Sequence, residues 1–166
     1  MTKDWDEMLS ALAEPGQPMP GFAVLQRIAQ RNVGARIFTV MVRDNAANVQ
    51  RRLHSSHPIE YPVSGFKPQT PGRWQDQVVG RREAFVANTI EEIAEVFPDH
   101  ELIKSLGCQS VVNVPIIFDN AVIGTLNLLE AAGHYTSERV AAAMELRPFG
   151  AAAMLAAQAV ELSTAR

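Results

Sequence analysis

Cys108 carries the most reactive side chain of this 166-residue sequence and is its only thiol. A cysteine acts as a nucleophile when its pKa is depressed and a base lies beside it. The nearest histidine in the sequence, His100, lies across a predicted helix, and Gly107, which ends that helix, provides no helix N-terminus to stabilise a thiolate. We therefore expect Cys108 to be a small, buried apolar residue at the start of a strand, and we assign no catalytic residue.

The four histidines give no metal-binding pattern. His54, His57, His100 and His134 are scattered, and no two of them stand four apart on a predicted helix. Pro58 excludes a regular helix around the first pair. A zinc or iron site would require the fold to gather distant groups, so we predict none.

A long loop offers side chains for non-covalent binding of a small molecule. The segment His57–Gly72 holds four prolines and two glycines, a composition that favours an ordered loop, and such loops often carry function. Tyr61 and Phe66 supply flat apolar surface, and Lys67 beside them would favour an acid or another anion. The alternative is that Tyr61 and Phe66 simply fill the space above a sheet.

Four further residues are candidates for the wall of the same pocket. Trp74 follows the loop on the next predicted helix, and Phe97 and His100 border the start of another. Ser110 begins a strand. Asn113 is a weaker candidate, because alternation along a regular strand would place it on the face opposite Ser110. A mostly apolar cavity with a few polar groups is typical of small-ligand sites.

The composition places these residues in one ordinary globular domain. The sequence is 47% hydrophobic and 20% charged, with a net charge of −3. No basic surface for nucleic acid is expected. The charged start MTKDWDEMLS lacks the apolar core of a signal peptide, and no apolar run approaches the ~20 residues of a membrane span. We expect a cytoplasmic protein that does not contact a membrane.

The apolar spacing and the helix and turn signals predict the order of elements. Helices are expected at Trp5–Leu12, Phe22–Val33, Trp74–Val79, Ile90–Phe97 and Pro98–Leu106, with a last helix after Thr136 that Pro148 and Gly150 kink or interrupt. Strands are expected at Ile37–Val42, Val49–Ser55 and Ala84–Ala87.

The runs Ser110–Phe118 and Ala121–Glu130 are predicted to form a hairpin around Asp119-Asn120, a dipeptide that tolerates positive φ. Neither run alternates cleanly between apolar and polar residues, so both strands should be buried on both faces. This requires cover on each side and favours an α+β fold with a central antiparallel sheet. Asn113, Thr125 and Asn127 are polar residues that need partners there.

The sequence GCQSVVNVPI, the Asp-Asn turn and VIGTLNLL together resemble the closing hairpin of a GAF domain, and GHYTSERVAAAMEL is similar to the family's step into its C-terminal helix. The resemblance extends back to about Pro18. It implies a profilin-like sheet with terminal helices on one face and the loop and short helices over a pocket on the other. Residues 1–17 would then be an N-terminal helical extension and residues 18–162 the GAF-like domain.

The resemblance implies a non-catalytic domain that binds a small molecule or mediates signalling. It also implies a homodimer through the N- and C-terminal helices, which the alanine-dense segment Ala141–Ala159 favours. One alternative is a thiol enzyme related to free methionine-(R)-sulfoxide reductase, a branch that uses several cysteines where this chain has one. The other is a structural dimer with a self-filled pocket.

Two ligand classes of the family leave no matching signature here. In place of the Asn-Lys…Phe…Asp-Glu pattern of cyclic-nucleotide-binding members, this chain has Thr89 after Asn88 and His100 after Asp99. Cys108 lacks the adjacent histidine that accompanies a covalently attached bilin. We therefore expect no cofactor, and the small molecule itself remains unidentified.

Overall fold

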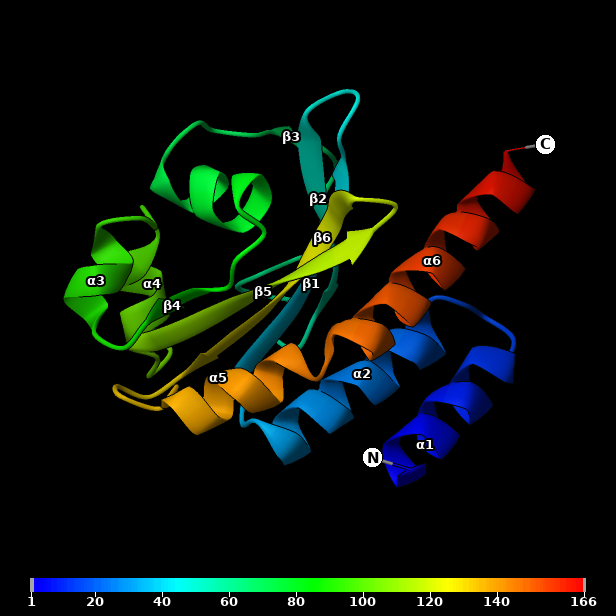
Figure 1. Cartoon of the computed structure of the whole chain (residues 1–166), viewed down its shortest axis with the longest axis horizontal. Coiled ribbons are helices and arrows are strands. Elements are labelled where there is room, and N and C mark those ends of the chain that lie inside the picture. The colour runs from blue at the N-terminus through cyan, green and yellow to red at the C-terminus, as the bar shows by residue number, and fades with distance from the viewer. Residues whose placement is uncertain (1, 166) are drawn as a thin grey trace.

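In the computed structural model, which describes residues 2–165, a six-stranded antiparallel sheet separates two layers of helices and loops (Figure 1). The strand order is β3-β2-β1-β6-β5-β4. The strands are β1 (Ile37–Asp44), β2 (Val49–Ser55), β3 (Lys67–Pro68), β4 (Phe85–Ala87), β5 (Ser110–Phe118) and β6 (Ala121–Glu130). The hairpin of β5 and β6 has the predicted bounds.

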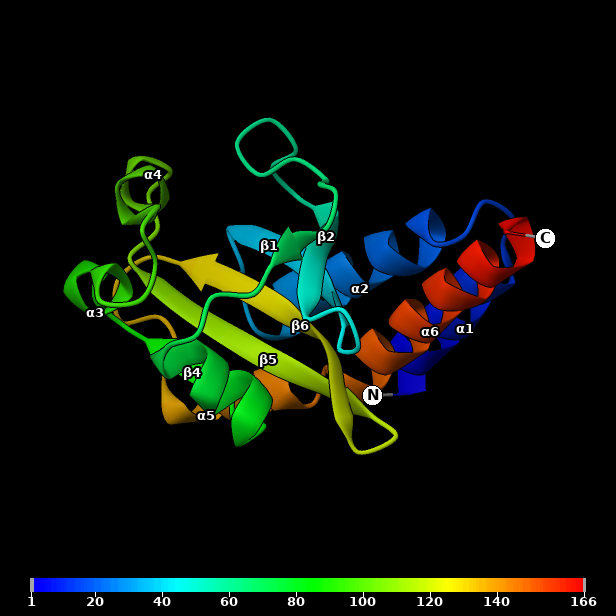
Figure 2. The same cartoon turned by 90° about the horizontal axis from the view of Figure 1, so that it is seen from above.

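Long helices cover one face of the sheet, and short segments cover the other (Figure 2). The first layer holds α1 (Thr2–Ala13), α2 (Met19–Asn32), α5 (Ser137–Met144) and α6 (Arg147–Thr164). The second holds the loop after β2, the π-helical segment η1 (Gln75–Gly80), α3 (Ile90–Ala94) and α4 (His100–Ser105). This is the expected α+β architecture, with terminal helices on one side and loop and short helices on the other.

The β5–β6 turn shows why the hairpin forms where it does. Asp119 and Asn120 both take positive φ, 47° and 61°, which the twist of a two-residue hairpin requires and which these residue types tolerate. Both strands are buried along most of their length. Their apolar side chains therefore join two clusters, one under the long helices and one under the loop and short helices.

Gly124 allows β6, β1 and α6 to approach one another closely. A Cβ built on Gly124 would lie 2.2 Å from the backbone oxygen of Met41 and 2.9 Å from the Sδ of Met154. Real side-chain atoms do not tolerate such contacts, so glycine is required for this packing.

Two helix starts are fixed by threonine caps. Thr89 accepts a hydrogen bond from the backbone N–H of Glu92, whose carboxylate accepts one from the N–H of Thr89 in return. Thr136 likewise accepts from the N–H of Arg139 at the start of α5. The cap at Thr136 confirms the predicted start of the C-terminal helical segment.

The C-terminal segment is two helices, with a break at Glu145 and Leu146. Pro148 lies in the first turn of α6, where its missing N–H is tolerated, so the interruption precedes the proline. Gly150 does not break α6. A Cβ there would lie 2.8 Å from the Cδ1 of Ile116, so the glycine allows the helix to pack against β5.

Within residues 2–165, one helical stretch, Ser137–Thr164, is long and apolar enough by composition to cross a membrane. A core helix of a globular domain meets the same criterion. In this fold α6 contributes Phe149, Ala153 and Met154 to the core beneath the sheet and packs against β5 and α2.

Candidate functional site

A cavity of about 410 Å³ lies between the sheet and its cover of loop and short helices. Strands β1, β2, β5 and β6 form its floor, and the segments 61–74 and 96–103 form its walls. Its lining residues are Ile37, Thr39, Met41, Gln50, Arg52, Tyr61, Pro68, Gln69, Thr70, Trp74, Val96, Phe97, Pro98, Asp99, Ile103, Val111, Asn113, Thr125, Asn127 and Leu129. The volume lies within the ~300–1,000 Å³ of small-molecule sites.

A row of polar side chains crosses the floor from strand to strand. The sheet register pairs Thr39 of β1 with Asn127 of β6, and Asn127 with Asn113 of β5. Asn113 donates from Nδ2 to Asn127 Oδ1 at 2.7 Å, and Asn127 donates from Nδ2 to Thr39 Oγ1 at 3.1 Å. Trp74, on the cover, donates from Nε1 to Asn113 Oδ1 at 2.9 Å.

The indole of Trp74 fixes the direction of this row. An indole nitrogen can only donate, so Asn113 must accept through its carbonyl oxygen and donate through its amide nitrogen. The same logic sets the amide of Asn127 and leaves Thr39 as the last acceptor. The hydroxyl hydrogen of Thr39 therefore stays available for a further acceptor, and the row connects the cover of the cavity to β1.

Three cavity residues carry buried polar atoms that have no hydrogen-bond partner among the described residues. These atoms are Thr125 Oγ1, Gln69 Nε2 and Arg52 Nε. Thr125 is 1% exposed and Gln69 is 8% exposed. Each unpaired buried group costs about 1–3 kcal/mol, and native proteins contain few of them. Three of the five such atoms among the described residues belong to this cavity, and the other two, Gln17 Oε1 and Arg51 Nε, belong to residues outside its lining.

Opposite charges stand at one end of the cavity. The guanidinium of Arg52 donates from Nη1 to the Pro62 carbonyl at 3.1 Å, and its Cζ lies 5.1 Å from the centre of the Tyr61 ring. The Tyr61 hydroxyl donates to Asp99 Oδ2 at 3.0 Å. Burial lowers the pKa of Arg52, an effect that Tyr61 and Asp99 oppose, while burial followed by the Asp99 charge raises the pKa of Tyr61.

Three of the seven ligand-binding candidates from the sequence line the cavity. Tyr61 and Trp74 are placed there by the loop and by the start of η1, and Phe97 by the connection between α3 and α4. Phe97 also packs edge-on against Phe85, with 5.7 Å between ring centres. Whether these residues touch a ligand remains a prediction.

The placement of Phe66 in the pocket wall was wrong, and Lys67, expected near the mouth of the pocket, is not a lining residue either. The strand β3, which holds Lys67, pairs with the start of β2 at the edge of the sheet, where both residues of β3 are exposed. Phe66 is half-exposed and packs under the guanidinium of Arg51, with 4.7 Å between Cζ and the ring centre. Lys67 is exposed and is not a lining residue, and the positively charged residue in the lining is Arg52.

His100 also lies outside the lining. Its Nδ1 is 3.1 Å from the Phe97 carbonyl oxygen and its Nε2 is 3.4 Å from Glu101 Oε1, so its ring closes the first turn of α4.

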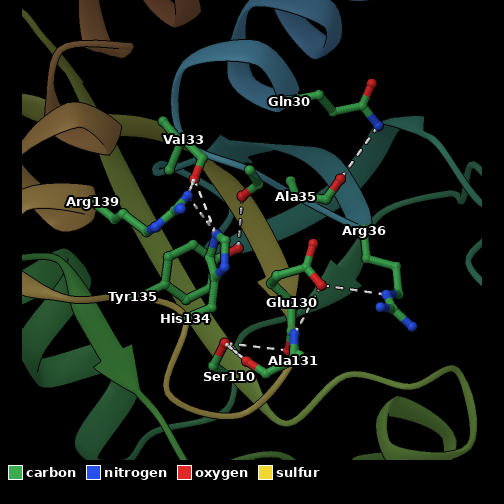
Figure 3. A network of polar contacts seen from close by, with 11 residues as sticks. Gln30, Val33, Ala35, Arg36, Ser110, Glu130, Ala131, His134, Tyr135 and Arg139 are labelled. Atoms are coloured by element: carbon green, nitrogen blue, oxygen red, sulfur yellow. Dashed lines mark hydrogen bonds and ion pairs between the residues drawn. The ribbon is translucent and has the colours of Figure 1, made fainter.

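The placement of Ser110 was wrong as well, because it lies on the helix-covered face of β5. Its hydroxyl is within hydrogen-bonding distance of the backbone oxygens of Glu130 and Ala131, at 3.2 and 2.7 Å. Figure 3 shows Ser110 in a network at this end of the sheet, with the Glu130–Arg36 ion pair and with His134 near the Val33 carbonyl. Alternation along β5 gives Asn113 the cavity face instead, so the weaker candidate is the lining residue.

Cys108 lacks the exposure and the lowered pKa of a nucleophilic thiol. It is fully buried, it is absent from the cavity lining, and burial raises its pKa to about 11, so the thiol stays protonated at neutral pH. These observations weigh against the thiol-enzyme alternative. Within residues 2–165, no group of three or more His, Cys, Asp or Glu side chains is arranged to hold a metal ion.

Four lining residues, Arg52, Gln69, Asp99 and Thr39, are not among the ligand-binding candidates predicted from the sequence. Arg52 belongs to the mostly polar strand Val49–Ser55, and Asp99 stands at the start of the predicted helix Pro98–Leu106. The period-two alternation of β1 was the one available indication for Thr39. It places Thr39 on the same face of the strand as Ile37 and Met41, and all three residues line the cavity. Gln69 lies in the loop, where no periodicity applies.

Comparison with known proteins gives a consistent result for the fold. The family model described as GAF domain matches residues 22–159. No curated protein matches the chain. The GAF domain of a phosphoenolpyruvate-protein phosphotransferase from Coxiella burnetii has a TM-score of 0.70 at 17% identity, covering 97% of this chain and 96% of that one.

Two further solved structures show the same architecture. The GAF domain of a two-component sensor histidine kinase from Bacillus halodurans has a TM-score of 0.65 at 12% identity, with 87% and 95% of the two chains covered. A GAF domain/HD domain protein from Geobacter sulfurreducens has a TM-score of 0.67 at 13% identity, with 90% and 98% covered. At these identities the likeness shows the fold alone.

Proposed function

The chain belongs to the GAF domain family, and from this premise we propose that it is a non-catalytic sensor domain that binds a small polar molecule in the 410 Å³ cavity. GAF domains are typically signalling or ligand-binding domains of sensor proteins, and the Bacillus halodurans structure comes from such a protein. Family membership alone does not decide between an occupied and a purely structural pocket.

The observation that carries the proposal is the polar floor beneath an open cavity. The row from Trp74 to Thr39 places fixed amides where apolar residues would pack more simply. The unpaired polar atoms of Thr125 and Gln69 add a cost that a bound molecule would offset. A self-filled pocket would be closed by Tyr61 and Phe66, yet Phe66 lies outside it and the volume between sheet and cover stays open.

The test compares two tryptophan variants of the same short segment. Val96 lines the cavity, whereas Ala94 is exposed on α3 and lies outside the lining. Val96→Trp should fill part of the cavity, and Ala94→Trp adds the same bulk at the surface. We expect a set of small metabolites screened by thermal shift to contain one that stabilises the wild type and Ala94→Trp but not Val96→Trp. Equal stabilisation of all three proteins would place the binding site elsewhere.

A second proposal, carried by a separate observation, is that the chain forms a homodimer through its terminal helices. Leu9 of α1, Met19 of α2 and Leu162 of α6 are 60%, 56% and 71% exposed. Figure 1 shows that these three helices run side by side on one face of the molecule. Large exposed apolar side chains on neighbouring elements favour association.

Light scattering at tens of micromolar tests this second proposal. We expect a dimer for the wild type and a monomer for the double variant Leu9→Arg/Leu162→Arg. Ile59→Arg is the matched control, because Ile59 is 88% exposed but belongs to the loop after β2. A monomeric wild-type protein would contradict the proposal.

A further inference from the structure

The charged end of the cavity contains one cation and one anion that form no ion pair with each other. Arg52 and Asp99 both line the cavity, but among the ion pairs of the described residues neither is joined to an opposite charge. Arg52 donates one hydrogen bond to the Pro62 carbonyl, and Asp99 accepts one from the Tyr61 hydroxyl. Both partners are neutral, so each charge still favours an opposite charge.

Tyr61 holds these two charges apart. The Arg52 guanidinium lies over the face of its ring, and the Asp99 carboxylate accepts from its hydroxyl at the far end of the side chain. Tyr61 is largely buried, so this arrangement is held by packing. The Arg52 guanidinium and the Asp99 carboxylate are therefore separated by the Tyr61 ring and its hydroxyl group. A small molecule that carries a negative group and a positive group on the same carbon atom can bridge it.

Two unpaired donors in the cavity add hydrogen bonds for a negative group. Gln69 carries a buried, unpaired Nε2, and Arg52 itself has an unpaired Nε. A carboxylate accepts several hydrogen bonds at once, and those from a guanidinium are the strongest and the most directional. Ile103, Val111 and Leu129 also line the cavity and offer apolar surface to the rest of a ligand.

We propose, resting on the ligand-binding function proposed above, that the cavity binds a zwitterion of the α-amino-acid class. Its carboxylate pairs with Arg52 and Gln69, its ammonium group pairs with Asp99, and its side chain lies against Ile103, Val111 and Leu129. A dianion such as a phosphate monoester meets repulsion from Asp99, and a simple cation meets repulsion from Arg52. A ligand with both charges satisfies both residues.

The experiment measures binding of matched ligands to the full chain by isothermal titration calorimetry. The twenty standard L-amino acids are tested first, and the tightest binder is compared with its deamino acid and its decarboxylated amine. We expect an amino acid to bind and each analogue to bind at least tenfold more weakly. Comparable binding of the deamino acid or of the amine would overturn the assignment of the corresponding charge.

Two variants assign the charges to residues. Asp99→Asn should weaken amino-acid binding and remove the preference over the deamino acid, whereas Arg52→Gln should remove the preference over the amine. The analogue series does not depend on either variant folding, so it stands alone if one does not. If no amino acid binds but another metabolite is blocked by Val96→Trp, the zwitterion assignment is wrong and the ligand-binding function stands. If nothing binds, both fail.

Discussion

Replacing the Thr125 hydroxyl by a methyl group should stabilise the ligand-free protein. Thr125 lies on β6, is 1% exposed, and its Oγ1 has no hydrogen-bond partner among the described residues. Thr125→Val keeps the β-branched shape and removes the unpaired polar atom. An unsatisfied buried polar group costs about 1–3 kcal/mol, so the free energy of unfolding should rise by ~1–3 kcal/mol.

Thr39→Val is the matched control, and its effect should have the opposite sign. Thr39 lies on the same face of the neighbouring strand and is 4% exposed, but its Oγ1 accepts a hydrogen bond from Asn127 Nδ2 at 3.1 Å. Removing that acceptor leaves a buried amide donor unpaired at the end of a hydrogen-bonded row. The free energy of unfolding should therefore fall by ~1–3 kcal/mol.

Calorimetric melting of the dialysed proteins separates the two cases. For a chain of 166 residues, each kcal/mol moves the melting temperature by roughly 2–4 °C. The two variants should therefore lie on opposite sides of the wild type, and Thr125→Val should also bind the cavity ligand less tightly. If both variants melt below the wild type by similar amounts, the Thr125 hydroxyl already has a hydrogen-bond partner in the ligand-free protein, and the reasoning is refuted.

Three further outcomes follow from single sites. Gly124→Ala places a Cβ 2.2 Å from a backbone oxygen and should lower the free energy of unfolding by ~3 kcal/mol or more, whereas Gly150→Ala meets a movable side chain and should cost less; urea unfolding of both variants would show the order. Burial lowers the pKa of His54 from 6.5, so the unfolded chain binds this proton more tightly, and stability should fall as the pH drops below about 6.5 and be flat above it. The variant His54→Gln should lose that slope in stability measured from pH 5 to 8. Cys108→Ser should cost on the order of 1 kcal/mol by thermal melting, and a thiol-dependent reductase activity that the substitution abolished would contradict the structural role.

Local rules were sufficient to predict most of the fold. The Asp119-Asn120 turn, the cap at Thr136 and the apolar runs of β5 and β6 are short-range signals, and the hairpin follows from them. The layered architecture then follows from the need to cover that hairpin on both faces. The break before α6 is less clear in sequence, because a proline ends one helix or starts the next with almost the same local pattern.

The floor of the cavity could not be predicted in the same way. Thr39, Asn127 and Asn113 meet only because three strands pair in one register, and a single sequence does not specify which residues stand opposite each other across β1, β6 and β5. Each of the three alone is an ordinary polar residue in an apolar strand. Their significance appears once the indole of Trp74 gives the row a direction.

The position of Arg52 shows most clearly why alternation alone misses the site. On a regular strand, Arg52 and His54 would share one face. The pairing of β2 with β1 is irregular here: Val40 stands opposite His54, and the next residue, Met41, stands opposite Arg52. This β-bulge accommodates one extra residue, so His54 reaches Gln26 of α2, with 2.7 Å between its Nε2 and Oε1, while Arg52 lines the cavity. Bulges often change the direction of side chains next to functional sites. Here the bulge directs the guanidinium of Arg52 into the proposed ligand site.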